Sequence, residues 1–432
     1  MARIFSERKQ YYLARFLLML FGICWAFNFY QHLSKVDNCF FVDLRNRVVG
    51  ARLMKQDISP YFFKWSSAFP ETLRDPIDGC NTKNSMVTAP PSLLLLMQPL
   101  TGISYKQICY LWAVIHYLFF LFIFGSIYFY FRNSYSRNLI TISGIILLFC
   151  SQWVQSIFVG QSHFILPAVL GTLILLSGSK WGYRFLSIGL LFSFLVWIRP
   201  NAILIFPFLL CCKEINRWQV IKGLLAGGLL LAGITLALNH ENEWLDFYLS
   251  CKEWIKMHIQ GIELIQCPHP EIVEGKLVKF QGEYPARLDS EITNLFGIIH
   301  HKFNVAVKQN YITVGSLIIY LALLYFSSKR PFGLLPDALL MGMFLYWLFE
   351  ITAPFNKTSY YFLELFFIIY YLAGKFKELN TASKVFLLLS FLFNFLSFVP
   401  INMVIAELCL IGSLCFYLFK EYFQSIRFSK TA

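Results

Sequence analysis

Twelve apolar stretches recur along these 432 residues, and they constrain the fold more than any other feature of the sequence. An apolar run of about 20 residues is long enough to cross the hydrocarbon core of a bilayer as a helix. We therefore expect an all-helical polytopic membrane protein with about 12 transmembrane helices. The predicted spans lie near residues 11–30, 107–131, 138–158, 163–178, 184–198, 201–212, 222–238, 309–327, 337–352, 360–374, 385–399 and 401–419.

The composition supports a membrane protein and argues against a soluble one. Hydrophobic residues make up 57% of the chain, charged residues only 14%, and the mean hydropathy is +0.57, whereas soluble domains average about 45–50% apolar residues. A net charge of +13 would also suit a nucleic-acid partner. The Lys and Arg residues, however, gather in short clusters between the apolar runs, which is how membrane topology is encoded. We expect no nucleic-acid partner.

These basic clusters set the predicted topology. The N-terminal segment is basic, so we expect it in the cytoplasm. The short apolar piece 90–100 is predicted to lie at the outer surface as an interfacial helix, because only then do the later clusters face the cytoplasm. The chain is then one membrane domain, residues 1–432, with cytoplasmic termini, a first outer loop at 31–106 and a second at 239–308. The later clusters are Arg132 and Arg137, Lys180 and Arg184, and Lys213, Arg217 and Lys222.

A densely charged segment, Val42–Tyr61, follows the first apolar span. It places Asp43 beside Arg45, Arg47 and Arg52, close to the predicted membrane surface. Ionisable residues at membrane depth are usually functional. An ion pair between Asp43 and Arg47, four residues apart on a helix, would instead only stabilise that helix, and this alternative stays open.

The same segment holds a second acid, Asp57. If the stretch between Asp43 and Asp57 were one unbroken helix, the two would lie about 21 Å apart. The paired carboxyl groups of a glycoside hydrolase lie within about 10 Å of each other. The spacing therefore favours a reaction that uses one carboxylate as a base.

Three further polar stretches fall on the same predicted outer side as Asp43. They are Gly160–His163, Arg199–Asn201 and Pro354–Tyr361, each between two apolar spans. Four polar segments thus share one predicted face of the membrane, and we expect them to form one site.

The order of these motifs resembles family 87 of the GT-C glycosyltransferases. The resemblance rests on Asp43 after the first span, Ala51-Arg52, Pro60-Tyr61, and the runs APPSLLLLMQPL, GQSHF and WIRPNAILIFPFLL. It covers Asp43 to Leu210 well and Pro354–Tyr361 more loosely. Members of that family are integral membrane enzymes that use polyprenyl-phosphate sugars, typically polyprenyl-phosphate-mannose. The resemblance implies a GT-C fold with juxtamembrane helices in a large first outer loop.

The resemblance also implies roles for individual residues. Asp43 occupies the position of the general base, which removes the proton of an acceptor hydroxyl. Arg199 lies where the family tends to carry a basic residue before proline, although it could instead extend towards lipid head groups. Where His is common in the family, this chain has Tyr360 and Tyr361. The candidates for binding the substrate and its phosphate are Arg45, Arg52, Gln161, His163, Arg199, Lys357, Tyr360 and Tyr361.

Gln161 and His163 could equally serve helix capping and packing. Glu364 and Glu407 fall within apolar spans, where we expect contacts between helices; a proton path, as in a transporter, is the alternative. Four cysteines face the predicted outside and could pair if that compartment is oxidising. The pairs would be Cys39 with Cys80 and Cys251 with Cys267.

The sequence therefore predicts an inverting glycosyltransferase that moves a hexose, mannose by the resemblance, from a polyprenyl phosphate to an acceptor hydroxyl at the outer face. The acceptor would be a lipid or a glycan, and membrane lipids would surround the enzyme. No metal or cofactor is expected, because the leaving group is already a lipid phosphate. We expect a bacterial inner membrane. A polymerase or ligase of lipid-linked glycans, or a lipid or sugar transporter or flippase, are the alternatives.

Overall fold

The computed structural model describes residues 2–38, 41–75, 78–79, 82–260, 272–273, 276–277, 309–352, 359–395 and 400–429. Helices dominate these ranges, and the strands among them are the two-residue β1 (Ile272–Val273) and β2 (Lys276–Leu277), which pair antiparallel. Apart from this hairpin, the expectation of an all-helical chain is confirmed for the described residues.

The helices follow one another along the chain with short connections. The α-helices are α1 (Ala2–Leu33), α2 (Val42–Met54), α3 (Pro91–Met97), α4 (Tyr105–Tyr130), α5 (Ser134–Leu148), α6 (Ser151–Val159), α7 (Ile165–Ser177), α8 (Arg184–Ile198), α9 (Phe206–Leu210), α10 (Arg217–Ala237), α11 (Glu241–Gln260), α13 (Gln309–Lys329), α14 (Leu335–Thr352), α15 (Phe366–Gly374), α16 (Thr381–Phe395) and α17 (Pro400–Ser429). The 3₁₀ helices are η1 (Val36–Asn38), η2 (Glu71–Leu73), η3 (Gln98–Gly102), η4 (Pro200–Ile205) and η5 (Ser359–Leu365).

Several helices are long and apolar enough to cross a membrane. In the described ranges, five pass on length and composition alone, and α5 with α6 would make a sixth span bent by 56°. Other predicted spans correspond to apolar helices of 10–17 residues, which is short for a bilayer about 30 Å thick. The protein is therefore a helical protein with several potential membrane spans, and the count of 12 stays a prediction. The five are Gln10–Leu33, Tyr105–Tyr130, Arg217–Ala237, Asn310–Lys329 and Leu335–Thr352.

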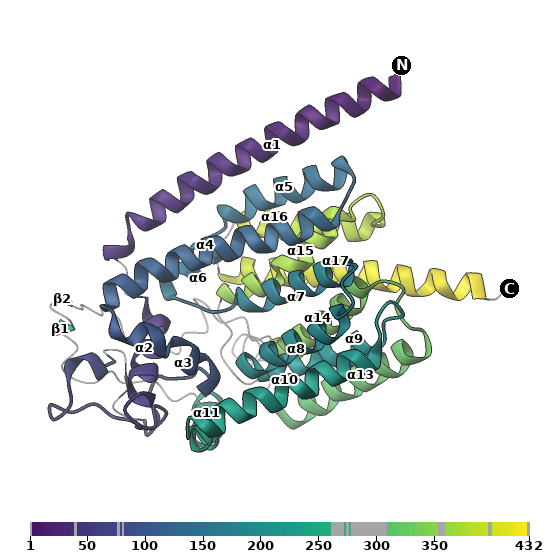
Figure 1. Ribbon diagram of the computed structural model, residues 1–432. Coiled ribbons are helices and arrows are strands. Elements are labelled where there is room, and N and C mark those ends of the chain that lie inside the picture. Colours follow the sequence, from purple (N-terminus) through teal and green to yellow (C-terminus); the bar gives the residue numbers. More distant parts are fainter. Residues whose placement is uncertain are drawn as a thin grey trace.

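Most helices run along one shared direction, so their connections lie at two ends of the bundle (Figure 1). One end carries α2, α3 and α11, and we call it the loop end; the first residues of α1 and the last of α17 lie at the other, the turn end (Figure 1). At the turn end, Lys213 N donates to Phe332 O at 2.9 Å. At the loop end, Asn84 Nδ2 donates to Ser250 O at 3.1 Å, which joins the first loop to α11.

The short helix predicted at 90–100 forms in two parts, α3 and then η3. Pro90 precedes it in an extended conformation and Pro91 occupies its first turn, where proline fits because its missing N–H would have no helical partner. Leu93, Leu94 and Leu95 are buried, and α3 packs against α2. Its expected position at a membrane surface stays a prediction.

A half-buried lysine, Lys64, organises the rest of the first loop. Lys64 Nζ donates to Asp78 Oδ1 at 2.9 Å, to Gly79 O at 2.7 Å and to Asn84 O at 2.6 Å. Burial raises the pKa of Asp78, and the contact with Lys64 acts in the opposite direction. These contacts hold two stretches of the first loop together.

Glycines allow α8 and α10 to pack with their backbones in contact. A Cβ on Gly223 would lie 2.1 Å from Leu186 O, and one on Gly189 would lie 2.1 Å from Val220 O. Ser193 Oγ adds a hydrogen bond of 2.8 Å to a backbone carbonyl of α10. Small residues at such crossings permit the close van der Waals packing that holds helices together in lipid.

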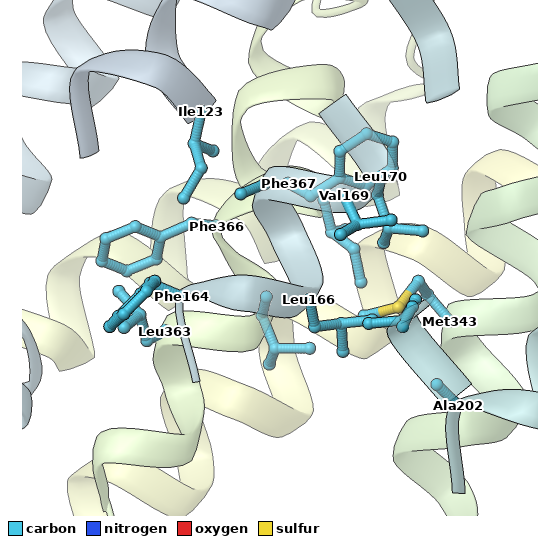
Figure 2. Close-up of a cluster of buried hydrophobic side chains, with 14 of the residues drawn as sticks. Ile123, Phe164, Leu166, Val169, Leu170, Ala202, Met343, Leu363, Phe366 and Phe367 are labelled. Atoms are coloured by element: carbon cyan, nitrogen blue, oxygen red, sulfur yellow. The ribbon is translucent and has the colours of Figure 1, made fainter. Parts of the chain in front are cut away.

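The apolar core at the centre of the bundle draws on α4, α7, η4, α14, η5 and α15 (Figure 2). Three of its buried members, Phe164, Ala202 and Leu363, each directly neighbour a polar residue in the sequence. The polar neighbours are His163, Asn201 and Glu364, in that order. Packing of this core therefore positions polar side chains from three separate segments.

We predict opposite effects for two glycine substitutions in α10. Gly223→Ala should lower stability by about 1–3 kcal/mol, because its methyl group collides with the α8 backbone. Gly228→Ala is the matched control, since a Cβ there meets nothing within 4 Å and alanine favours helix by about 1 kcal/mol. Thermal denaturation of the purified variants compares them. Equal stability of the two would show that α8 and α10 are not in backbone contact.

Candidate functional site

Asp43 lies at the partly exposed N-terminal end of α2, a helix that is otherwise buried. It is in the first turn of α2 and partly exposed, whereas every residue of α2 from Leu44 to Met54 is buried. Phe41, just before the helix, adopts a left-handed conformation with φ 47°, which turns the chain sharply into α2. A carboxylate in a first turn interacts favourably with the positive end of the helix dipole.

Arg47 ties this first turn to the loop between α6 and α7. Its Nη1 donates to Gly160 O at 2.5 Å and its Nη2 to Gln161 Oε1 at 2.8 Å, both buried. Gly160 has φ +82°, and a Cβ there would lie 2.4 Å from the Cβ of Leu44. The α2 turn that carries Asp43 therefore rests directly on this loop.

Beside it, three ionisable side chains meet in the interior, and we call them the Arg199 triad: His163, Arg199 and Glu364. Arg199 Nη2 lies 2.5 Å from Glu364 Oε1, and Arg199 Nη1 lies 2.6 Å from His163 Nδ1. His163 Nδ1 also contacts Glu364 Oε1. The relative exposures of the three side chains are 7%, 13% and 4%.

His163 Nδ1 faces both a donor, Arg199, and an acceptor, Glu364. A neutral ring with its proton on Nε2 accepts from Arg199, which can only donate, whereas a ring with its proton on Nδ1 donates to Glu364. In either tautomer Arg199 donates to Glu364, and the guanidinium balances the charge of the carboxylate.

Further polar groups surround the triad. The ring of Tyr361 lies 4.1 Å from that of His163, centroid to centroid. Asn201 Nδ2 donates to Glu350 Oε1, and it lies 3.4 Å from the hydroxyl of Tyr346. The segments involved are the loop before α7, the start of η4, the end of α14 and η5, all at the loop end (Figure 1).

The loop between α6 and α7 joins the first turn of α2, which carries Asp43, to the triad. Arg47 donates to Gly160 and Gln161 of this loop, and His163, two residues on, contacts Arg199. The charge of Asp43 also acts on the Tyr361 hydroxyl, more weakly than those of Glu350 and Glu364. Arg47 and His163 both interact electrostatically with His116, a fully buried residue of α4. The four polar segments singled out in the sequence thus converge, as far as the structure describes them.

The structure directs two of the expected phosphate-binding residues elsewhere. Arg45 donates to Arg74 O at 3.2 Å and stacks over Tyr105, with its Cζ 4.6 Å from the ring centroid. Arg52 donates to Thr72 O at 2.9 Å. Both hold the η2 segment of the first loop and lie outside the Arg199 triad.

Other expectations fall outside the described residues. Lys357 lies there, as do Cys39, Cys80 and Cys267, so both cysteine pairings stay predictions. Tyr360 belongs to η5, but its side chain is not among those described. Gln161, His163, Arg199 and Tyr361 are all brought to the same place.

Sequence reasoning missed the contributions of Arg47 and Glu364. The sequence suggests Arg47 only as a partner for Asp43, whereas its described hydrogen bonds reach across to Gly160 and Gln161. For Glu364 the sequence predicts a contact between helical segments, and the structure places that contact within the site. The sequence signal that could have identified Glu364 is a single acidic residue within an apolar run, five residues after Ser359.

Within the described ranges, no three His, Cys, Asp or Glu side chains converge as metal ligands. The polar groups present are guanidinium donors, carboxylate acceptors and hydroxyls, which suit an anionic and hydroxylated ligand. Comparisons with protein-family models, curated proteins and solved structures gave no match for this chain.

We predict that Gly160→Ala destabilises the protein by about 1–3 kcal/mol, because alanine is strained at positive φ and its methyl group would displace Leu44. Gly102→Ala, at a position where a Cβ meets nothing within 4 Å, serves as the control. Thermal unfolding measures both. If Gly160→Ala were as stable as the control, α2 would not rest on this loop as described.

Proposed function

We propose that this chain is an integral membrane glycosyltransferase that transfers a hexose, mannose by the motif resemblance, from a polyprenyl phosphate to an acceptor hydroxyl. The observation that carries the proposal is the position of one partly exposed carboxylate, Asp43, on a helix turn that Arg47 ties to the loop leading into the Arg199 triad, at one end of an apolar helical bundle. The motif resemblance to family 87 of the GT-C enzymes supports the same assignment. The acceptor is a lipid or glycan at the outer face of a bacterial inner membrane.

The reaction needs a base on one side of the sugar and a cation on the other. Asp43 takes the proton from the acceptor hydroxyl, whose oxygen attacks the anomeric carbon. The bond from that carbon to the phosphate oxygen breaks, and its electron pair stays on the phosphate. Arg199 stabilises the charge that develops there through charge-assisted hydrogen bonds. Attack opposite the leaving phosphate inverts the anomeric carbon.

The surroundings of the two groups fit these roles. Asp43 is accessible, as a base that meets a soluble or lipid-borne hydroxyl must be, whereas Arg199 is largely buried, where electrostatic interactions are stronger. The ring of Tyr361 lies 4.1 Å from that of His163, centroid to centroid, and its hydroxyl interacts electrostatically with Arg199 and, more weakly, with Asp43. Hydroxyl and amide groups of Tyr361 and Gln161 are suited to the hydroxyls of a sugar.

We predict that Asp43→Asn abolishes transfer from radiolabelled polyprenyl-phosphate-mannose, because an amide cannot accept the proton. Asp57→Asn should keep full activity: Asp57 is exposed, and it adopts φ +57°, a conformation that asparagine tolerates. The assay uses purified protein in nanodiscs with a lipid extract as acceptor, and it scores mannosylated product and released mannose.

The same assay separates the alternatives. Consumption of a lipid-linked oligosaccharide, with polyprenyl-phosphate-mannose left intact, would indicate a polymerase or ligase. Movement of lipid across the bilayer without cleavage would indicate a flippase. Full transfer by Asp43→Asn would remove Asp43 from the role of base.

A further inference from the structure

Glu364 carries a charge into an apolar environment. It lies in the sequence FLELFF, between Leu363 and Leu365, both of which are buried, and its own side chain is 4% exposed. An unpaired carboxylate there would be costly, so burial of this charge requires a partner. Arg199 supplies that partner at 2.5 Å.

This pairing has a consequence for ligand binding. The guanidinium of Arg199 contacts the Glu364 carboxylate through Nη2, and its Nη1 contacts His163. A phosphate that approaches the same side of the guanidinium meets the Glu364 carboxylate, which already lies there. Two anions on one guanidinium in a buried site repel each other strongly.

We propose that Glu364 is an internal counterion that stands in for the phosphate of the donor, and that phosphate binding displaces it from Arg199. The proposal rests on the proposed function of the site, because it concerns the phosphate that Arg199 is assigned to bind. Arg199 exchanges one anionic partner for another, so its charge is balanced both before and after binding.

The neighbourhood offers the displaced carboxylate other partners. Once Arg199 turns to the phosphate, His163 Nδ1 no longer accepts from it and can donate to Glu364 if the ring is protonated there. The hydroxyl of Tyr346 also forms a hydrogen bond with Glu364. The charged or titratable groups that face Glu364 from the packed elements are His163, Arg199, Tyr346, Glu350 and Tyr361.

Two roles of Glu364 predict opposite results. In one, Glu364 competes with phosphate for Arg199; in the other, it only holds Arg199 in position. Glutamine in place of Glu364 has nearly the same shape and keeps an oxygen that can accept from Arg199, but it has no charge. If Glu364 competes with phosphate, its neutralisation should tighten phosphate binding. If Glu364 only positions Arg199, the change should weaken binding.

The experiment measures the affinity of a short-chain polyprenyl monophosphate for the full-length protein in nanodiscs, at one pH and one salt concentration. Glu364→Gln should bind it about tenfold more tightly than the unmodified protein, a change in keeping with the loss of one competing charge-assisted hydrogen bond. In the transfer assay, KM and kcat should both fall, because the lipid phosphate product leaves more slowly. Unchanged or weaker binding overturns the proposal.

Glu350→Gln is the matched control. It removes an equal charge from the same cluster, but Glu350 accepts a hydrogen bond from Asn201, whereas Glu364 pairs directly with the guanidinium at 2.5 Å. We expect a gain of less than about threefold, from the screened long-range charge alone. An equal gain in both variants would mean that only net charge matters, which contradicts an exchange of partners at Arg199.

Two further arms complete the test. Inorganic phosphate should compete with the lipid phosphate and should gain affinity in Glu364→Gln, because the exchange concerns the phosphate and not the lipid chain. No gain for either ligand overturns the proposal.

If Glu364→Gln does not fold, Glu364→Asp replaces it. Aspartate keeps the charge but withdraws it from Arg199, so this variant must also bind the lipid phosphate more tightly than the unmodified protein.

The outcomes separate this proposal from the proposed function. If the unmodified protein binds and transfers, and Glu364→Gln shows no gain, only the counterion proposal fails. If the unmodified protein binds no lipid phosphate at all, the proposed function fails and the counterion proposal fails with it.

Discussion

The ion pair between Arg199 and Glu364 is the interaction on which the loop end of this protein depends. Each charge is nearly buried in an apolar bundle, and removal of one partner from such a pair typically costs about 3–5 kcal/mol. The pair therefore fixes the approach of η4 to η5, and His163 extends it to the loop before α7. Three segments far apart in the sequence are held in one arrangement by a requirement for charge neutrality.

The backbone is irregular where these polar groups lie. Arg199 directly precedes the 3₁₀ helix η4, Glu364 lies in the 3₁₀ helix η5, and Gly160 has a left-handed conformation. Non-helical backbone at membrane depth is tolerated only where protein buries it or where it lines a cavity. The regular helices and their apolar core supply the enclosure, while the breaks in them turn polar side chains towards a common point. Asp43 reaches this point from α2, which Arg47 anchors to the same loop.

Much of this arrangement could be predicted from the sequence, and the rest could not for physical reasons. Hydropathy identifies the helical segments, and the distribution of basic residues groups Asp43, Gly160–His163 and Arg199 on one side, where the structure brings them together. Neither hydropathy nor charge distribution predicts the direction in which an arginine side chain points. Arg45 and Arg52 turn to the carbonyls of residues 72 and 74, which depends on how the first loop folds back, and periodicity does not encode that.

In the proposed function, the loop end binds the phosphate of a polyprenyl-linked donor at Arg199. A cryo-electron microscopy structure of the protein in nanodiscs with bound polyprenyl phosphate is the sharpest test of this binding mode. Phosphate oxygens should lie about 2.7–2.9 Å from the guanidinium of Arg199, with Glu364 turned away and Asp43 facing the space that the sugar would fill. Phosphate bound at the turn end, or at a surface remote from an intact pair of Arg199 and Glu364, would show that Arg199 does not bind the donor.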